Sequence, residues 1–233
     1  MVIPALNEEK TIYRVVRKTL SVDPSLKVIV IDDGSTDKTA KRAREAGAHV
    51  IRLKRNMGQW EALRLGFRKA LKEGFNVVIT MDGDGQHDPL FIPFLLEPIE
   101  KGRADLVVGS RFLCENSHHI VTAPYRHVGV KFLSWLFSLL TGVKLTDVMS
   151  GFRAYSSDLL RLLVRKLRER QYGALEAIFI AWRSGARICE LPVNSKANKE
   201  SKKGSMRFFL NLCRVLLRTL FIIMLCPSSK QLS

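Results

Sequence analysis

The chain has 233 residues and 46% hydrophobic content, which suits one large folded domain and excludes a disordered protein. Its 38 lysine and arginine residues against 22 acidic ones give a net charge of +16, so anionic partners such as phosphorylated substrates, lipid headgroups or nucleic acid are expected. The four cysteines show no metal-ligand spacing and are expected to be reduced thiols in the cytosol. No signal peptide is expected, because acidic residues follow Met1 too soon.

The first half of the chain alternates short apolar runs with segments of helical periodicity. Apolar residues recur every three or four positions from Ile12 to Leu20 and predict a helix, for which Asn7 is the expected N-cap. A second helix is expected to end at Ala46, and a third follows the loop that begins at Asn56. The runs predicted as strands are residues 2–4, 27–31, 49–53 and 77–81. This alternation predicts a mostly parallel, doubly wound α/β sheet flanked by helices.

The second half continues the pattern less regularly. Helices are expected over residues 90–101, 126–140, 158–168 and 173–184, and strands over 105–109, within 147–155, and over 187–193. Residues 112–125 are expected to form a loop. The resulting division is an α/β domain over residues 1–194, a basic loop over 195–207, and an amphipathic helix with a tail over 208–233.

The stretch from Val77 to Pro89, VVITMDGDGQHDP, places two carboxylates directly after a buried strand. In open α/β sheets, ligands bind at the carboxyl ends of the strands. Asp82 and Asp84, with Gln86 nearby, form a hard oxygen donor set that favours Mg²⁺ or Mn²⁺ shared with substrate phosphates. The alternative is a turn rich in Asp and Gly that binds nothing.

A second acidic pair, Asp32 and Asp33, ends the strand predicted over residues 27–31. The two acidic strand ends are therefore expected side by side at one edge of the sheet. One pair can accept hydrogen bonds from a base or ribose while the other holds a metal on a diphosphate. No GxGxxG follows the first strand and no GxxxxGK[ST] occurs, so a dinucleotide-binding Rossmann site and P-loop phosphoryl transfer are not expected.

The C-terminal segment 208–226 is nearly long enough to cross a bilayer. However, Arg207, Asn211, Arg214 and Arg218 recur on one helical face. Each arginine near the bilayer centre would cost about 2.5–3.5 kcal/mol. The prediction is an amphipathic helix that lies in the membrane surface, and the alternative is a helix packed on the protein's own core.

Five ordered motifs, VIPALNE, IDDGSTDKT, MDGDGQHDP, GSR and D-x-x-SGFRAY, resemble those of family 2 glycosyltransferases of the GT-A fold. Within that family the chain is most similar to the dolichol-phosphate mannose and glucose synthases, from residue 2 to about residue 193. The resemblance implies a nucleotide-sugar donor such as GDP-mannose or UDP-glucose, Mg²⁺ or Mn²⁺, and inversion at the anomeric carbon. It also implies a polyprenyl (dolichyl) phosphate acceptor and peripheral attachment at the cytoplasmic face of a membrane.

The resemblance also assigns roles to particular residues. Donor binding is implied for Pro4, Leu6, Glu8, Ile31, Asp32, Asp33, Asp82, Gly83 and Asp84, and metal binding for Asp82, Asp84 and Gln86. Acceptor-phosphate binding is implied for Arg111, Arg126, Lys199, Lys202 and Lys203. The residues expected to be catalytic are Asp84, Arg111 and Arg126.

The charge of the acceptor decides whether a base is needed. A phosphate is already anionic at neutral pH, whereas a hydroxyl must lose a proton to a general base. Glu176 occupies the place where base-using relatives carry a carboxylate, and the alternative is that it positions a loop. The histidines at 87, 118, 119 and 127 show no ligand spacing and are expected to be solvated loop residues.

Two other functions stay open at this point. One is a family 2 glycosyltransferase that acts on a glycan or other hydroxyl acceptor. The other is a nucleic-acid binder, which the charge of +16 would suit. No nucleic-acid partner is expected, however, because aromatic and basic residues are not interleaved and the acidic motif would repel phosphates without a metal. Whether an integral-membrane partner subunit exists is left open.

Overall fold

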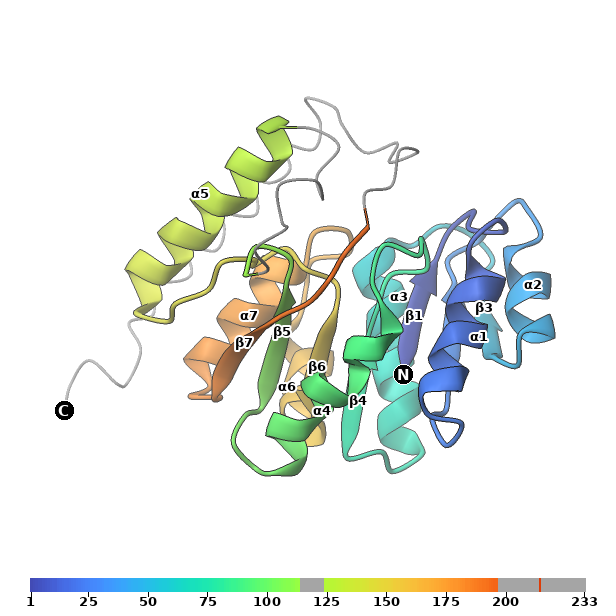
Figure 1. Ribbon diagram of the computed structural model, residues 1–233, viewed down its shortest axis with the longest axis horizontal. Helices are drawn as coiled ribbons and strands as arrows, with labels where there is room; N and C mark the ends of the chain where they lie inside the picture. Colours follow the sequence, from blue (N-terminus) through green and yellow to red (C-terminus); the bar gives the residue numbers. More distant parts are fainter. Residues whose placement is uncertain (114–123, 197–213, 215–233) are drawn as a thin grey trace.

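The computed structural model describes residues 1–113, 124–196 and 214, and the side chains of 124–126 lie outside the description. Within these residues a seven-stranded sheet runs in the order β3-β2-β1-β4-β6-β5-β7 (Figure 1). The strands are β1 (Val2–Ala5), β2 (Ile29–Asp32), β3 (His49–Arg52), β4 (Val77–Thr80), β5 (Leu106–Ser110), β6 (Arg153–Ser156) and β7 (Ile188–Pro192). Each predicted strand is confirmed.

The sheet is mostly parallel, as predicted. β6 is the exception, because it pairs antiparallel with β4 on one side and with β5 on the other. Pairing of β1 with β2 sets Pro4 opposite Ile31, and β1 lies between β2 and β4. The carboxyl ends of β1, β2, β4 and β5 therefore share one edge of the sheet, the upper edge in Figure 1.

Helices cover both faces of the sheet, because alternate strand residues point to opposite sides. Ile3, Val30 and Ile79 join one core, under α1 (Ile12–Val22), α2 (Thr39–Glu45) and α4 (Ile92–Glu100). Neighbouring strand residues such as Val2 and Ile29 join the other core, under α3 (Gln59–Lys72), α6 (Ser157–Lys166) and α7 (Ala174–Arg183). A short 3-10 helix, η1 (Pro89–Phe91), links the acidic loop to α4.

The helix α5 (Pro124–Thr141) stands above the second core and confirms the helix predicted over residues 126–140 (Figure 1). Leu133 and Phe137 are buried in that core. The opposite side of α5 exposes a row of large apolar side chains at helical spacing, Val128, Phe132, Trp135 and Leu139. Within residues 1–113 and 124–196, no helix combines the length and apolar character that crossing a bilayer requires.

The predicted start of the first helix and the predicted C-terminal helix differ in outcome. Asn7 is not the N-cap of α1, because the helix begins at Ile12 with Thr11 as its N-cap. Asn7 instead adopts φ 57° and its Oδ1 accepts a hydrogen bond from the Thr36 amide, a conformation that Asn tolerates better than most residues. The predicted surface helix 208–226 lies outside the described residues except Arg214, whose guanidinium donates to Glu169 at 2.9 Å.

Candidate active site

The loop after β4 presents the two carboxylates of the acidic motif. Asp82 Oδ1 accepts a hydrogen bond of 2.7 Å from the Gln59 side-chain amide, and Asp82 Oδ2 lies 3.7 Å from His87 Nε2. Asp84 Oδ1 accepts from the backbone amide of Gln86 at 3.0 Å. These contacts fix the loop and hold both carboxylates at the carboxyl edge of the sheet.

Close backbone packing shapes the space around Asp82. A Cβ atom on Gly151 would lie 2.6 Å from Asp82 Oδ2, so a larger residue there would force this carboxylate or the segment before β6 to shift. The Thr80 hydroxyl donates to the Gly151 carbonyl at 2.8 Å and fastens the same segment to β4. Gly85 adopts φ 77°, which glycine allows at no steric cost, and this turns the chain toward Gln86.

The second acidic pair holds the loop that precedes α3. The two oxygens of Asp33 accept hydrogen bonds from the amides of Met57, at 2.7 Å, and Gly58, at 3.0 Å. Burial raises the pKa of Asp33, and these two hydrogen bonds act in the opposite direction. Since Gln59 contacts Asp82, the start of α3 joins the two acidic strand ends, which confirms their predicted proximity.

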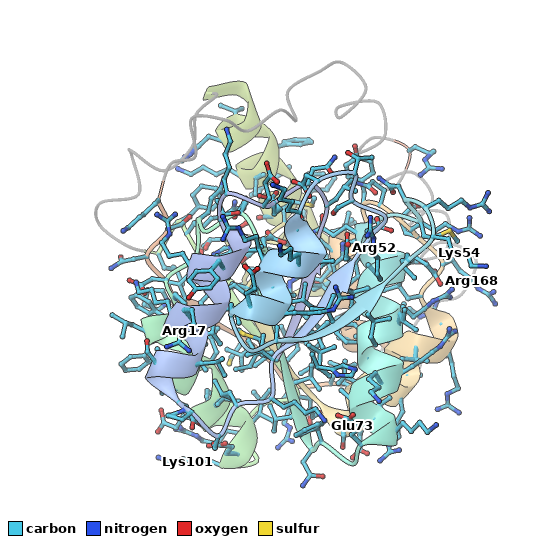
Figure 2. The ribbon with its side chains drawn as sticks, turned by 90° about the vertical axis from the view of Figure 1, so that its right-hand side faces the viewer. Arg17, Arg52, Lys54, Glu73, Lys101 and Arg168 are labelled. Atoms are coloured by element: carbon cyan, nitrogen blue, oxygen red, sulfur yellow. The ribbon has the colours of Figure 1, made fainter. Side chains whose placement is uncertain are left out.

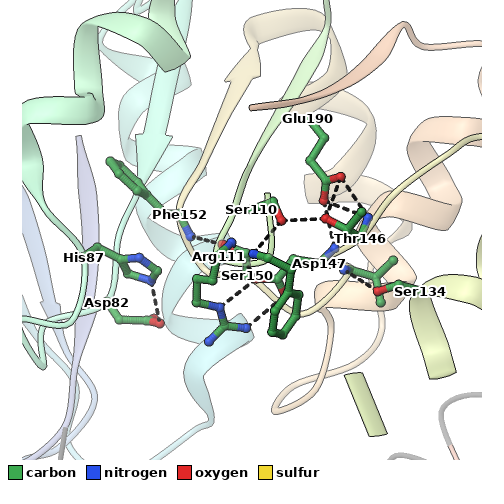
Figure 3. Close-up of polar contacts among 12 residues, drawn as sticks. Asp82, His87, Ser110, Arg111, Ser134, Thr146, Asp147, Ser150, Phe152 and Glu190 are labelled. Atoms are coloured by element: carbon green, nitrogen blue, oxygen red, sulfur yellow. Dashed lines mark hydrogen bonds and ion pairs between the residues drawn. The ribbon is translucent and has the colours of Figure 1, made fainter. Parts of the chain in front are cut away.

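Arg111 follows β5 directly and makes a forked ion pair with Asp147 (Figure 3). Its Nε and Nη2 donate to the two carboxylate oxygens at 2.7 and 2.9 Å, and its backbone amide adds a third bond. The Asp147 side chain is fully buried, and that of Arg111 is 19% exposed. Burial by itself would raise the pKa of Asp147, but the charge and the hydrogen bonds of Arg111 together hold that pKa below its usual value.

A partly buried carboxylate, that of Glu190, fixes the backbone that carries Asp147. Glu190, on β7, accepts hydrogen bonds from the amides of Thr146 and Asp147, at 2.8 Å in the latter case (Figure 3). Burial raises the pKa of Glu190, and the hydrogen bonds oppose that shift. The Ser110 and Thr146 hydroxyls lie 2.6 Å apart and close the network. The carboxyl ends of β5 and β7 are thereby tied to the Asp147 segment.

Arg111 also lies within electrostatic reach of the acidic motif. Burial would lower the pKa of Arg111, but Asp147, and after it Asp82 and Asp84, raise that pKa. The structure thus places Arg111 within electrostatic reach of the Asp82 and Asp84 carboxylates. Arg126 lies in the first turn of α5 with its side chain outside the description, and the residues at 199, 202 and 203 lie outside it entirely.

The root of the predicted basic loop touches the acidic motif. The Lys196 amide donates to the Gln86 carbonyl at 2.8 Å, and Ser195 forms an isolated antiparallel bridge with His87. Three exposed cations lie in another part of the molecule, where Figure 2 labels Arg52, Lys54 and Arg168 on its right-hand side. Of these, Arg52 lies 3.3 Å from a carboxylate oxygen of Asp32, so it places positive charge at the acidic end of β2.

The remaining residues assigned to donor binding occupy β1 and β2 and their ends. Pro4 and Ile31 are buried neighbours within the sheet, whereas Leu6 is 38% exposed. The Glu8 carboxylate accepts a hydrogen bond from the Thr11 hydroxyl at 3.0 Å. Asp32 is fully buried, with one oxygen accepting from the Ser35 amide.

Two expectations about titratable residues are resolved. The view of His87 as a solvated residue is wrong, because it is buried against the Phe152 ring, with centroids 5.2 Å apart, and faces Asp82. For Glu176, Oε2 accepts hydrogen bonds from the amides of Arg168, at 3.1 Å, and Glu169, at 2.6 Å. This geometry favours the loop-positioning alternative.

Sequence reasoning gave no role to several residues that build the site, namely Gln59, Asp147, Gly151, Arg153 and Glu190. Arg153 is fully buried and donates to the carbonyls of Val148, Ser150 and Ala174, so it shapes the segment that carries Gly151. Three of these five, Asp147, Gly151 and Arg153, fall within the motif D-x-x-SGFRAY, which was the available signal. Gln59 and Glu190 lie outside the recognised motifs, so the sequence offered no signal for them.

Comparison with known proteins defines the class. The model of glycosyl transferase family 2 matches residues 1–221, and the chain belongs to this family. A UDP-N-acetylglucosamine–dolichyl-phosphate N-acetylglucosaminyltransferase of Methanococcus voltae is 34% identical, covering 84% of each chain. An undecaprenyl-phosphate mannosyltransferase of Micrococcus luteus is 33% identical over 82% of this chain and 81% of its own.

Solved structures support the same fold. Glucosyl-3-phosphoglycerate synthase from Mycobacterium tuberculosis, in complex with Mn²⁺ and UDP-glucose, superposes with a TM-score of 0.71 at 25% identity. The match covers 98% of this chain and 79% of that one. The mostly parallel sheet with helices on both faces is the GT-A architecture of these neighbours.

The acidic loop suits a divalent cation. Asp82, Asp84 and Gln86 offer oxygen donors, the type that Mg²⁺ and Mn²⁺ prefer. Within the described residues no group of three His, Cys, Asp or Glu side chains forms a closed metal cage. A set of two carboxylates and an amide fits a cation that completes its coordination with substrate phosphates and water.

Proposed function

We propose that this protein is an inverting, metal-dependent glycosyltransferase that moves a hexose from a nucleotide sugar to a polyprenyl phosphate. The observation that carries the proposal is the guanidinium of Arg111, which Asp147 fixes within electrostatic reach of the carboxylates of Asp82 and Asp84. A cation next to a metal-binding acidic pair suits a reaction in which one phosphate group attacks and another leaves. The names of the relatives support the same acceptor class.

On the donor side, Asp82, Asp84 and Gln86 would hold Mg²⁺ or Mn²⁺. That metal would neutralise the charge of the departing nucleoside diphosphate. The residues around the first two strand ends would bind the nucleotide, namely Pro4, Leu6, Glu8, Ile31, Asp32, Asp33 and Gly83. GDP-mannose and UDP-glucose are the donors we propose.

On the acceptor side, Arg111 would orient the lipid phosphate through the N–H groups that Asp147 leaves unused. Arg126 and the lysines at 199, 202 and 203 would complete the phosphate site. An ionised phosphate oxygen attacks the anomeric carbon opposite the leaving diphosphate, which inverts the configuration and requires no proton transfer to a base. The engagement of Glu176 with two backbone amides supports a reaction without it as a base.

A lipid acceptor places the enzyme at a membrane. We propose peripheral attachment at the cytoplasmic face, supported by the exposed apolar row on α5 and by the basic composition. Liposome flotation across a salt series tests this. Association that strengthens with anionic lipid and weakens with salt is expected. Salt-resistant, charge-independent association would argue for insertion, and a failure to float would argue against the lipid acceptor.

The decisive experiment is a donor and acceptor screen. GDP-mannose, UDP-glucose and UDP-N-acetylglucosamine would each be offered with a short-chain polyprenyl phosphate or with 3-phosphoglycerate, in Mn²⁺ or EDTA. We expect transfer to the polyprenyl phosphate in the presence of Mn²⁺ and no transfer in EDTA. Transfer only to the hydroxyl of 3-phosphoglycerate, the acceptor class in the name of the solved neighbour, would favour the hydroxyl-acceptor alternative.

A further inference from the structure

The position of Arg111 raises an electrostatic conflict. Figure 3 shows its guanidinium on the side of the Asp147 network that faces Asp82, and the charges of Asp82 and Asp84 both act on it. Arginine readily forms two-point hydrogen-bonded contacts with carboxylates. If Arg111 swung onto either of these carboxylates, it would occupy oxygen atoms that a divalent cation needs.

Asp147 removes that freedom. It accepts from Nε and Nη2 of Arg111, at 2.7 and 2.9 Å, which fixes both the place and the plane of the guanidinium. Asp147 cannot follow Arg111 toward the acidic loop, because it is fully buried and Glu190 holds its backbone amide at 2.8 Å. Arg111 thus has a fixed partner in Asp147, and the N–H groups on the other edge of its guanidinium can bind another anion.

We propose that Asp147 is a positioning residue that keeps Arg111 from pairing with Asp82 and Asp84, so that Arg111 does not compete with a divalent cation for these carboxylates. The proposal rests on the metal-binding role proposed above for the acidic loop. It gives a role to a fully buried carboxylate that pairs with Arg111. It also predicts that the effect of Asp147 on metal binding passes through Arg111.

A double-mutant cycle with a binding readout tests this, with no turnover required. Affinity for Mn²⁺ would be measured by calorimetry in the presence of UDP or GDP, whichever the unaltered protein binds more tightly. Asp147→Asn is expected to weaken Mn²⁺ binding by about tenfold, because it frees Arg111. In the Arg111→Met background, the same Asp147→Asn substitution is expected to change the affinity by less than about twofold.

The chain offers a matched control and a milder variant. Asp105 makes the same forked contact with Arg187 away from the acidic loop, so Asp105→Asn should leave Mn²⁺ affinity unchanged. Arg111→Lys keeps the Asp147 charge compensated but loses the two-point contact, so it should fold and still weaken Mn²⁺ binding. Equal losses from Asp147→Asn in both backgrounds, or unaltered Mn²⁺ binding in Asp147→Asn and Arg111→Lys, would overturn the positioning role. A failure of the unaltered protein to bind Mn²⁺ would instead overturn the proposed metal site and the inference with it.

Discussion

The two ends of β5 carry the same ion pair in opposite surroundings. At the carboxyl end, Arg111 forks onto Asp147 with N–O distances of 2.7 and 2.9 Å. At the amino end, Arg187 forks onto Asp105 at 3.0 and 2.9 Å. The side chains of the first pair are 19% and 0% exposed, and those of the second are 56% and 26% exposed.

Because the two pairs share their contact geometry, we expect the difference in burial to decide what each contributes to stability. In a solvent-exposed ion pair, contacts between the two side chains replace their contacts with water, so the pair adds little to stability. A buried pair leaves an uncompensated charge when one partner is removed. The buried pair lies at the edge where ligands bind in α/β sheets. The ion pair whose loss should cost the most stability is therefore the one at the candidate site.

The largest expected effect is the loss of stability on breaking the buried pair. Asp147→Ala should lower the free energy of unfolding by about 3–5 kcal/mol, because Arg111 would be left buried without its partner. Asp105→Ala should change the midpoint of urea unfolding much less, because the side chains of Arg187 and Asp105 both keep contact with solvent. Equal shifts of the urea midpoint in the two variants would contradict the comparison.

The second prediction tests the anions that Arg111 faces. Asp84→Ala should weaken Mn²⁺-dependent nucleotide binding by about 100-fold or more, since it removes an expected metal ligand. The fold should survive, because Asp84 is a partly exposed loop residue. Calorimetry with Mn²⁺ and nucleotide checks this, with circular dichroism as the folding control. Unaltered affinity would remove Asp84 from the metal site.

The third prediction concerns the close approach of Gly151 to Asp82. Gly151→Ala should cost about 1–3 kcal/mol of stability and weaken Mn²⁺ binding, because its Cβ would sit 2.6 Å from Asp82 Oδ2. Gly129→Ala on α5 is the matched control, since a Cβ there meets nothing within 4 Å and alanine favours helix by about 1 kcal/mol. Unfolding in urea separates the two, and a neutral Gly151→Ala would show that the segment moves aside freely.

Much of this region could be predicted because its signals are local. Short apolar runs that end in Asp82 or Asp33 identify a buried strand and the edge at which its ligand groups lie. The motif that contains Asp84 likewise needed no knowledge of distant residues.

The rest depends on contacts between segments far apart in the chain. Asp147 contacts Arg111 although the whole of α5 separates them in the sequence, and Gln59 contacts Asp82 from the start of another helix. Glu190 reads as an ordinary strand residue until β7 is placed beside β5. His87 was misjudged because the absence of ligand spacing says nothing about burial against Phe152.

The fourth prediction extends the comparison to a carboxylate held by backbone amides. Glu176→Gln should reduce transfer to a polyprenyl phosphate by less than about tenfold, because a glutamine oxygen can still accept from Arg168 and Glu169 and the ionised acceptor needs no base. Initial rates at saturating donor would show this. A fall of about 10²–10⁴ would indicate a general base and a hydroxyl acceptor.

The smallest expected effects separate the two ion pairs by salt and pH. Screening shortens the Debye length from about 10 Å at 0.1 M to about 3 Å at 1 M salt, so the coupling between Arg187 and Asp105 should fall while that between Arg111 and Asp147 persists.

The Arg187 hydrogen bonds lower the pKa of Asp105, and Arg111 lowers that of Asp147 against the effect of burial. A carboxyl pKa that is lower in the folded state contributes stability above the unfolded pKa of about 3.9, and the contribution is lost as pH falls through the folded pKa. Double-mutant cycles in urea should therefore give constant couplings from about pH 7 to 5 and declining ones below about pH 4. Equal salt sensitivity of the two couplings would show that burial does not distinguish the pairs.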